Sequence, residues 1–189
     1  MINSRYSFAQ INAFSMQNGL ILGLWTLLAL LAMLLSFTYS MLSLVSAIML
    51  IFAPIVLFLL TKKYRSLVAT EGVFTITQGF LHSFFTMLYA ATWVALIVFV
   101  YLSYLDKGYV FDAYTMYFNR PEVQEILAQK EMQAQLAIAL QGMTIQEVVE
   151  GLRFIPPATY AGMIFYLNLL FSPVISLLIG LFLKSYKMK

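Results

Sequence analysis

The chain has 189 residues, of which 62% are hydrophobic and only 10% are charged. A typical soluble domain is about 45–50% apolar and about 25% charged, so this chain has too few polar groups to cover a soluble surface. This composition excludes an ordinary soluble enzyme, a disordered tail and a coiled coil, and it indicates an integral membrane protein. The chain contains no cysteine and a single histidine, His82. We therefore expect no disulfide, no thiolate chemistry, no multi-histidine metal site and no cofactor.

The first charge-free run lies between Arg5 and Lys62 and is too long for one span. A single helix over it would be more than twice as long as a bilayer core of about 30 Å is thick. We predict a first span at residues 19–37 and a second at 41–60, joined by a tight turn at the polar and aromatic segment Ser36–Ser40. Pro54 is expected to bend the second span.

Two more charge-free runs follow, from Glu71 to Asp106 and from Arg153 to Lys184. They predict a third span at residues 79–101 and a fourth at 159–183, and residues 66–78 are expected to begin the third helix at the membrane surface. The predicted fold is an all-α integral membrane four-helix bundle, with residues 1–189 forming a single membrane domain.

Charged residues are distributed unequally between the two sides of this bundle. With four spans, both termini and the loop between spans two and three share one side. That side carries seven basic residues and one acid: Arg5, Lys62, Lys63, Arg65, Lys184, Lys187 and Lys189 against Glu71. The other side carries four basic and seven acidic residues. Because positive charge favours the cytoplasm, we predict that both termini are cytoplasmic. Basic residues that flank apolar runs are topology signals, and we expect no nucleic-acid partner.

The segment of residues 106–155 is then an extracytoplasmic helical insertion between spans three and four. Its Tyr-rich start suits the outer membrane interface, and residues 120–153 are expected to form a helical hairpin. We predict a capping pair of Asn119 and Glu122 at the start of the first helix, a break at Gly142, and a capping box of Thr144 and Glu147. The hairpin either lies against the membrane or caps the bundle, or it forms a docking surface for a partner protein or a lipid-linked substrate.

Several short segments carry a family resemblance. They are Ile76-Thr77-Gln78-Gly79-Phe80, Tyr117-Phe118-Asn119 with Pro121-Glu122, the Gln-rich helix that follows, and Gln141-Gly142-Met143-Thr144 with Glu147. With these segments the chain resembles a family of small four-span bacterial proteins called domain of unknown function 4199. One departure is that Arg120 stands between Asn119 and Pro121. The resemblance implies no established activity. It implies a location in a bacterial inner membrane, and it suggests an association with polyprenyl-phosphate glycosyltransferases.

Polar residues inside the predicted spans are candidate functional residues. Gln17, Asn18, Gln78 and His82 lie at a similar depth and form a candidate intramembrane polar cluster. The simpler interpretation is a neutral histidine that is hydrogen-bonded between helices. No span contains Asp or Glu, which argues against a proton relay. Asn168, in the fourth span, is expected to bond across a helix interface.

Small residues form ridges that let helices approach closely. Gly19 and Gly23 open the first span, and Ser172, Ser176 and Gly180 recur at a spacing of four in the fourth. These ridges could pack the bundle, a homo-oligomer or a partner.

Three functions compete. The leading hypothesis is a non-enzymatic accessory or scaffold subunit in the lipid bilayer, which docks a membrane partner such as a polyprenyl-phosphate glycosyltransferase system. Its candidate partner surface is Val148, Val149 and Leu152 on the last helix of the insertion. The alternative is a small oligomeric transporter or lipid translocase. A membrane enzyme that uses His82 is the least favoured, and we predict that the chain is not an enzyme.

Overall fold

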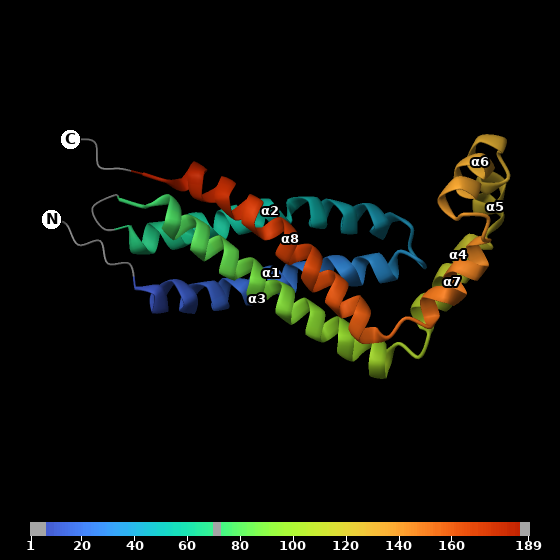
Figure 1. Ribbon diagram of the computed structural model, residues 1–189, viewed down its shortest axis with the longest axis horizontal. Coiled ribbons are helices and arrows are strands. Elements are labelled where there is room, and N and C mark those ends of the chain that lie inside the picture. The colour runs from blue at the N-terminus through green and yellow to red at the C-terminus, as the bar shows by residue number, and fades with distance from the viewer. Residues whose placement is uncertain (1–6, 70–72, 186–189) are drawn as a thin grey trace.

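The computed structural model describes residues 7–69 and 73–185, in which every regular element is a helix. Arg5, Glu71, Lys187 and Lys189, which contribute to the predicted charge asymmetry, lie outside the described residues. Four long helices form a bundle (Figure 1): α1 (Phe8–Leu35), α2 (Met41–Val68), α3 (Ile76–Val100) with the π-helical turn η2 (Tyr101–Leu105), and α8 (Pro157–Leu183). Each is long and apolar enough to cross a membrane, and the chain is a multi-pass membrane protein in a lipid bilayer.

Two helices are longer than the predicted spans. The first begins at Phe8 rather than at residue 19, and the second continues to Val68 rather than ending at residue 60. The prediction ended each span where the apolar stretch ends, but neither extra segment contains Gly or Pro to stop a helix. Lys62 and Lys63 therefore lie within α2. A helix of a membrane protein can hold them there because long basic side chains near its end can reach polar surroundings.

The third helix is the centre of the bundle. It packs along both α1 and α8, and α2 packs mainly against α1 and touches α3 and α8 more weakly. The start of α1, the end of α8 and the connection from α2 to α3 share one end of the bundle, which we call the terminal end (Figure 1). There, Phe74 and Ser185 exchange two backbone hydrogen bonds of 3.0 and 2.9 Å, which tie this connection to the end of α8.

Glycines bring α8 and α1 very close to α3. A Cβ atom added to Gly180 would lie 2.7 Å from the carbonyl oxygen of Ile76, and one added to Gly79 would lie 2.9 Å from the Cα of Gly180. On α1, a Cβ at Gly19 would lie 2.5 Å from the Cβ of Tyr89. Such short distances leave no room for a side chain, so these glycines set the spacing between the helices.

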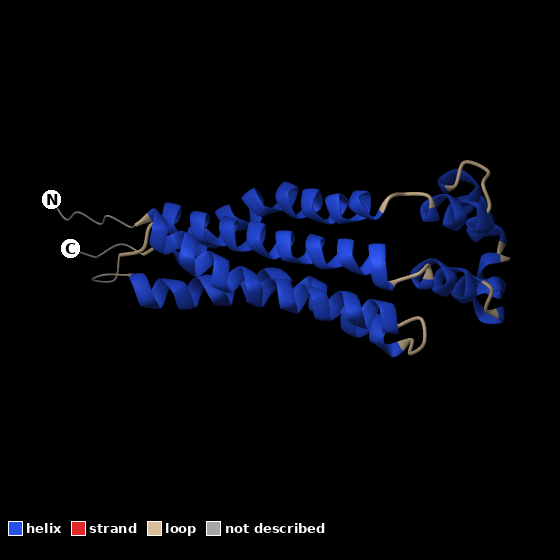
Figure 2. Cartoon of the chain, turned by 90° about the horizontal axis from the view of Figure 1, so that it is seen from below, coloured by secondary structure: helices blue, strands red, loops and turns tan. Residues whose placement is uncertain are grey.

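The remaining helices form an extension beyond the opposite end of the bundle (Figures 1 and 2). They are α4 (Tyr109–Phe118), α5 (Pro121–Leu127), α6 (Lys130–Ala139) and α7 (Ile145–Arg153). The pair α4 and α7 forms the stem, and α5 and α6 form the tip. The predicted hairpin differs from this arrangement, because α7 pairs with α4 from the Tyr-rich segment rather than with the Gln-rich helix.

Of the two helix caps predicted in the extension, one is present in the structure and one is not. The capping box of Thr144 and Glu147 is confirmed at the start of α7. The capping pair of Asn119 and Glu122 is wrong, because Arg120 precedes the first turn of α5 and no side chain caps it. Pro121 instead occupies the first helical position, where its missing N–H has no intrahelical partner to lose.

The extension is attached to the turn between α1 and α2. The ring of Phe37 in this turn contacts the ring of Tyr114 at 4.8 Å between centroids, in an edge-to-face arrangement. Arg120 donates a hydrogen bond to the carbonyl oxygen of Phe37. Within the stem, Arg153 of α7 pairs with Asp112 of α4. On the other side, Phe111 of α4 contacts the ring of Tyr160 in α8 at 6.1 Å between centroids, and the Tyr160 hydroxyl donates to the carbonyl oxygen of Leu152 at 2.6 Å. The stem is therefore held both at the turn after α1 and at the start of α8.

Candidate functional site

The single histidine is fully buried between three helices. Its Nε2 atom lies 2.9 Å from the side-chain nitrogen of Asn18 on α1, and its Nδ1 atom lies 3.1 Å from the hydroxyl oxygen of Thr61 on α2. The amide nitrogen of Asn18 can only donate, so Nε2 accepts this hydrogen bond. In a neutral imidazole the proton is then on Nδ1, which donates to Thr61. Both ring nitrogens of His82 have a partner on a different helix.

Further polar groups complete this site. The Ser15 hydroxyl donates to the carbonyl oxygen of His82 at 3.1 Å, and the hydroxyls of Thr61 and Ser83 lie 3.0 Å apart. The ring of Tyr64 stacks on the imidazole, with 4.1 Å between centroids and an angle of 6° between planes. We call this set the His82 network: Ser15, Asn18, Thr61, Tyr64, His82 and Ser83. It joins α1, α2 and α3 in the half of the bundle near the terminal end.

The structure brings together two of the four residues in the predicted polar cluster. Asn18 contacts His82, but the side chain of Gln78 accepts hydrogen bonds from the backbone N–H and the hydroxyl of Thr75 and caps the start of α3. Gln17 is exposed on the outside of α1. The difference follows from helix geometry, since adjacent residues such as Gln17 and Asn18 point in different directions.

Sequence reasoning missed the contribution of α2. Thr61 and Tyr64 were placed beyond the second span, because that span was predicted to end at residue 60. Their spacing of three residues is the signal that could have found them, and Ser15 and Asn18 have the same spacing on α1. Each pair presents two polar or aromatic groups on one helix face, just outside a predicted span.

The arrangement of the His82 network suits helix association rather than chemistry. The imidazole has no exposed surface and no carboxylate partner, and both of its nitrogens are hydrogen-bonded. A general base must itself lie within reach of a bound substrate, and a proton relay needs a second titratable group. Among the described residues, no group of three His, Asp, Glu or Cys side chains could hold a metal ion.

The small residues predicted to pack helices lie within the bundle. Gly19 and Gly180 contact α3 as described above, and Gly23 makes an ordinary contact with Ala90 at 3.5 Å. Ser172 and Ser176 are also buried. Both ridges therefore face neighbouring helices of the same chain.

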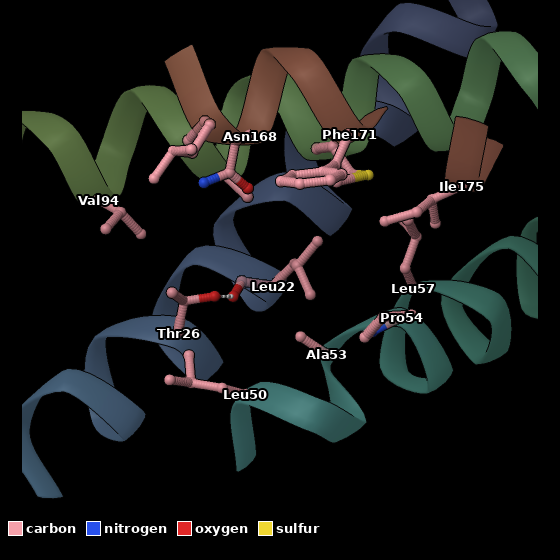
Figure 3. A pocket seen from close by; sticks show the side chains of 14 residues that line it. Leu22, Thr26, Leu50, Ala53, Pro54, Leu57, Val94, Asn168, Phe171 and Ile175 are labelled. Carbon is pink, nitrogen blue, oxygen red and sulfur yellow. Dashed lines mark hydrogen bonds between the residues drawn. The ribbon is translucent and has the colours of Figure 1, made fainter. Parts of the chain in front are cut away.

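A crevice lies between α2 and α8, above a floor formed by α1 and α3 (Figure 3). Its volume is about 270 Å³. Asn168 lines this crevice, and its side-chain nitrogen donates to the carbonyl oxygen of Ile164 in the same helix at 3.0 Å. The prediction that Asn168 bonds across a helix interface is wrong, because the helix offers its own carbonyl one turn earlier.

The predicted partner surface on α7 is only partly available. Val149 is 5% exposed and lies in the stem of the extension, where α7 packs on α4. Val148 is half-buried and Leu152 is exposed. The apolar side of α7 was predicted to face a partner, but α4 covers much of it. Larger exposed apolar side chains lie elsewhere in the extension: Met116, Ile126, Ile138, Met143 and Phe154.

Residues 16–185 match the family model described as "Protein of unknown function (DUF4199)". Because this match covers most of the chain, the protein belongs to that family, as its short segments suggested. No curated protein and no solved structure matches the chain.

Proposed function

We propose that this protein is a non-enzymatic accessory subunit of a bacterial inner membrane, which uses its helical extension to dock a membrane partner. The observation that carries this proposal is the tip of the extension. Ile138 on α6 is 81% exposed, and Met143 in the following turn is also exposed. Methionine is enriched at protein interfaces, and exposed apolar side chains at a polar tip offer area that a partner can bury.

The attachment of the extension supports the same role. Phe37, Tyr114 and Arg120 hold the stem against the turn between α1 and α2, so the tip has a defined position beyond the bundle (Figure 2). Because the His82 network is closed, it supports a packing role for the spans. The family resemblance makes a polyprenyl-phosphate glycosyltransferase the partner class to test first.

The docking proposal can be tested by replacing the exposed apolar groups at the tip. The double variant Ile138→Ser and Met143→Ser, purified as the full chain in mild detergent, should insert and elute normally but lose the partner. Gln135→Ser, at an exposed position of α6, is the matched control and should retain it. Equal partner recovery from both variants would overturn the proposal, as would recovery of a homo-oligomer alone from the wild-type protein.

We also propose that the terminal end faces the cytoplasm. In the described residues this end carries Lys62, Lys63 and Lys184, and the extension carries most of the acids. This distribution supports the orientation through the preference of basic residues for the cytoplasm. A periplasmic reporter fused after Gln129 should be active, and one fused after Lys63 should be inactive. The reverse pattern would overturn the orientation and leave the docking proposal standing.

A further inference from the structure

The crevice between α2 and α8 has a buried floor and an exposed rim. Leu57 on the inner side of the α2 wall and Val94 on the floor are each 1% exposed, whereas Leu167 and Phe171 of α8 are each 55% exposed. The crevice therefore opens sideways between the two helices, toward the lipid that surrounds the spans (Figure 3).

Local sequence explains why a space remains here. On the α2 wall, Ala53 is small, and the adjacent Pro54 lacks the N–H that would bond to the carbonyl of Leu50. The indole of Trp25 on α1 donates to the carbonyl oxygen of Met49 at 2.8 Å and fixes this part of α2 against α1. Because α2 is held there and contacts α8 only weakly, the two helices leave a gap above α1 and α3.

The lining of the crevice defines the chemistry of its occupant. No charged residue lines it, and the side-chain donors of Asn168 and Thr26 each bond to a carbonyl of their own helix. A charged or strongly polar ligand would have nothing to balance its loss of hydration. An apolar occupant would restore the van der Waals contacts that an empty space forfeits.

The surroundings of the crevice indicate its occupant. Four long apolar helices form its walls and floor, and its open side faces the hydrocarbon core of the bilayer. A flexible hydrocarbon chain can follow the irregular space of about 270 Å³ between the side chains, and the bilayer supplies such chains at the open side.

We propose that the crevice between α2 and α8 is a binding site for one acyl chain of a membrane phospholipid. The chain enters sideways between Leu50 and Phe171 and lies on the floor formed by α1 and α3, and the charged headgroup stays at the membrane surface. This site is independent of the extension and of the docking proposal.

The test uses a fatty acid with a photoreactive group in its chain, which the expressing cells incorporate into their phospholipids. After irradiation of the membranes, peptide mapping should find lipid adducts on the floor and inner wall, at Leu57, Met87 and Ile175. Ala53→Phe fills the crevice from the α2 wall and should abolish these adducts. Ala47→Phe, the same change at an exposed position of α2, should retain them.

A second pair of variants changes residues of the α8 wall of the crevice. Ile175→Phe should also abolish the adducts on Leu57 and Met87, and its neighbour Val174→Phe, on the exposed face of α8, should retain them. The proposal is overturned if the wild-type protein is labelled at Val174 but not on the crevice floor, or if a correctly eluting Ala53→Phe protein keeps its floor adducts. The wild-type chain has no cysteine, so the Ala53→Cys protein carries a single thiol. The proposal is also overturned if this protein forms a disulfide-linked dimer in membranes, because a second copy then occupies the crevice.

Discussion

The four-helix bundle and the helical extension use polar groups in different ways. In the bundle, the side chains of the His82 network point inward and bond between helices. In the extension, the ion pair of Arg153 and Asp112 and the capping box of Thr144 and Glu147 lie at the surface. The bundle buries a continuous core, whereas the described part of the extension buries Ala113 and Val149.

This difference follows from the solvent of each region. Between helices in a bilayer there is little hydrophobic driving force, so close packing and interhelical hydrogen bonds hold the bundle. Apolar burial drives the stem together in water, but the buried area there is small and exposed ion pairs add little. The extension therefore depends on the bundle for its position, and damage to the bundle should affect both regions.

The largest effect is expected where the helix backbones are closest. Gly180→Leu would place a side chain against the Ile76 carbonyl, and overpacking of this kind costs about 3 kcal/mol. Gly162→Leu is the matched control on the same helix, because an added Cβ there meets nothing within 4 Å. The thermal stability of the protein in detergent should fall for the first variant only. Similar stability for both would mean that α8 does not rely on close contact with α3.

A smaller loss of bundle stability is expected from His82→Leu. This change leaves the Asn18 amide without its partner, whereas the Thr61 hydroxyl keeps its hydrogen bond to the Leu57 carbonyl. One buried unpaired group costs about 1–3 kcal/mol. His82→Gln keeps a hydrogen-bonding side chain and should lose less. Gln17→Leu, on the exposed side of α1, should have no effect on the thermal midpoint. A midpoint for His82→Leu that equals the wild-type value would contradict a packing role for the network.

Much of the bundle could be predicted from sequence because its signals are local. Charge-free runs identify the spans, and the four-residue spacing of Ser172, Ser176 and Gly180 indicates a packing face. The pairing of Gly180 with Gly79 could not be predicted, because it depends on the register between two helices. The same holds for Thr61 and His82, which lie far apart in the chain.

The extension was harder to predict because its helices are short and because the helix against which each one packs is set by long-range contacts. The capping box at Thr144 is a local motif and was predicted, whereas the pairing of α7 with α4 is a long-range choice. That choice buries Val149, which sequence reasoning assigned to a partner surface. The crevice at Asn168 also escaped prediction, since a space between helices depends on how the backbones diverge.

The attachment of the extension offers a way to separate the two regions. Phe37→Ser removes the ring that contacts Tyr114, and an aromatic pair of this kind contributes about 0.5–1.5 kcal/mol. Hydrogen exchange should become faster in α4 and stay unchanged in α3. Tyr39→Ser changes an exposed residue in the same turn and should leave both helices unchanged. Faster exchange in α3 would show that the bundle depends on the extension, contrary to the comparison above.

The smallest effect is expected at the start of α7, where it depends on pH. The Glu147 carboxylate accepts hydrogen bonds from the backbone N–H of Thr144 at 2.7 Å and from its hydroxyl at 2.9 Å. These bonds favour the ionised form and hold the pKa of Glu147 below its ordinary value of 4.5. Since the folded pKa is lowered, the stabilisation is present above the ordinary value and is lost as the pH falls through the folded pKa.

The NMR shift of the Thr144 amide proton should report this titration directly. As the pH falls below the ordinary carboxyl range, the amide loses its charged acceptor and its resonance should move, because hydrogen bonds to ionised groups are stronger than those to neutral ones. Glu147→Gln should abolish the titration of this resonance, and Glu150→Gln, one turn along the same exposed helix face, should leave it intact. Resonances in the middle of α8 should not move in this range, because α8 contains no carboxylate and no histidine. A Thr144 amide that titrates equally in both variants would mean that the capping box does not control the start of α7.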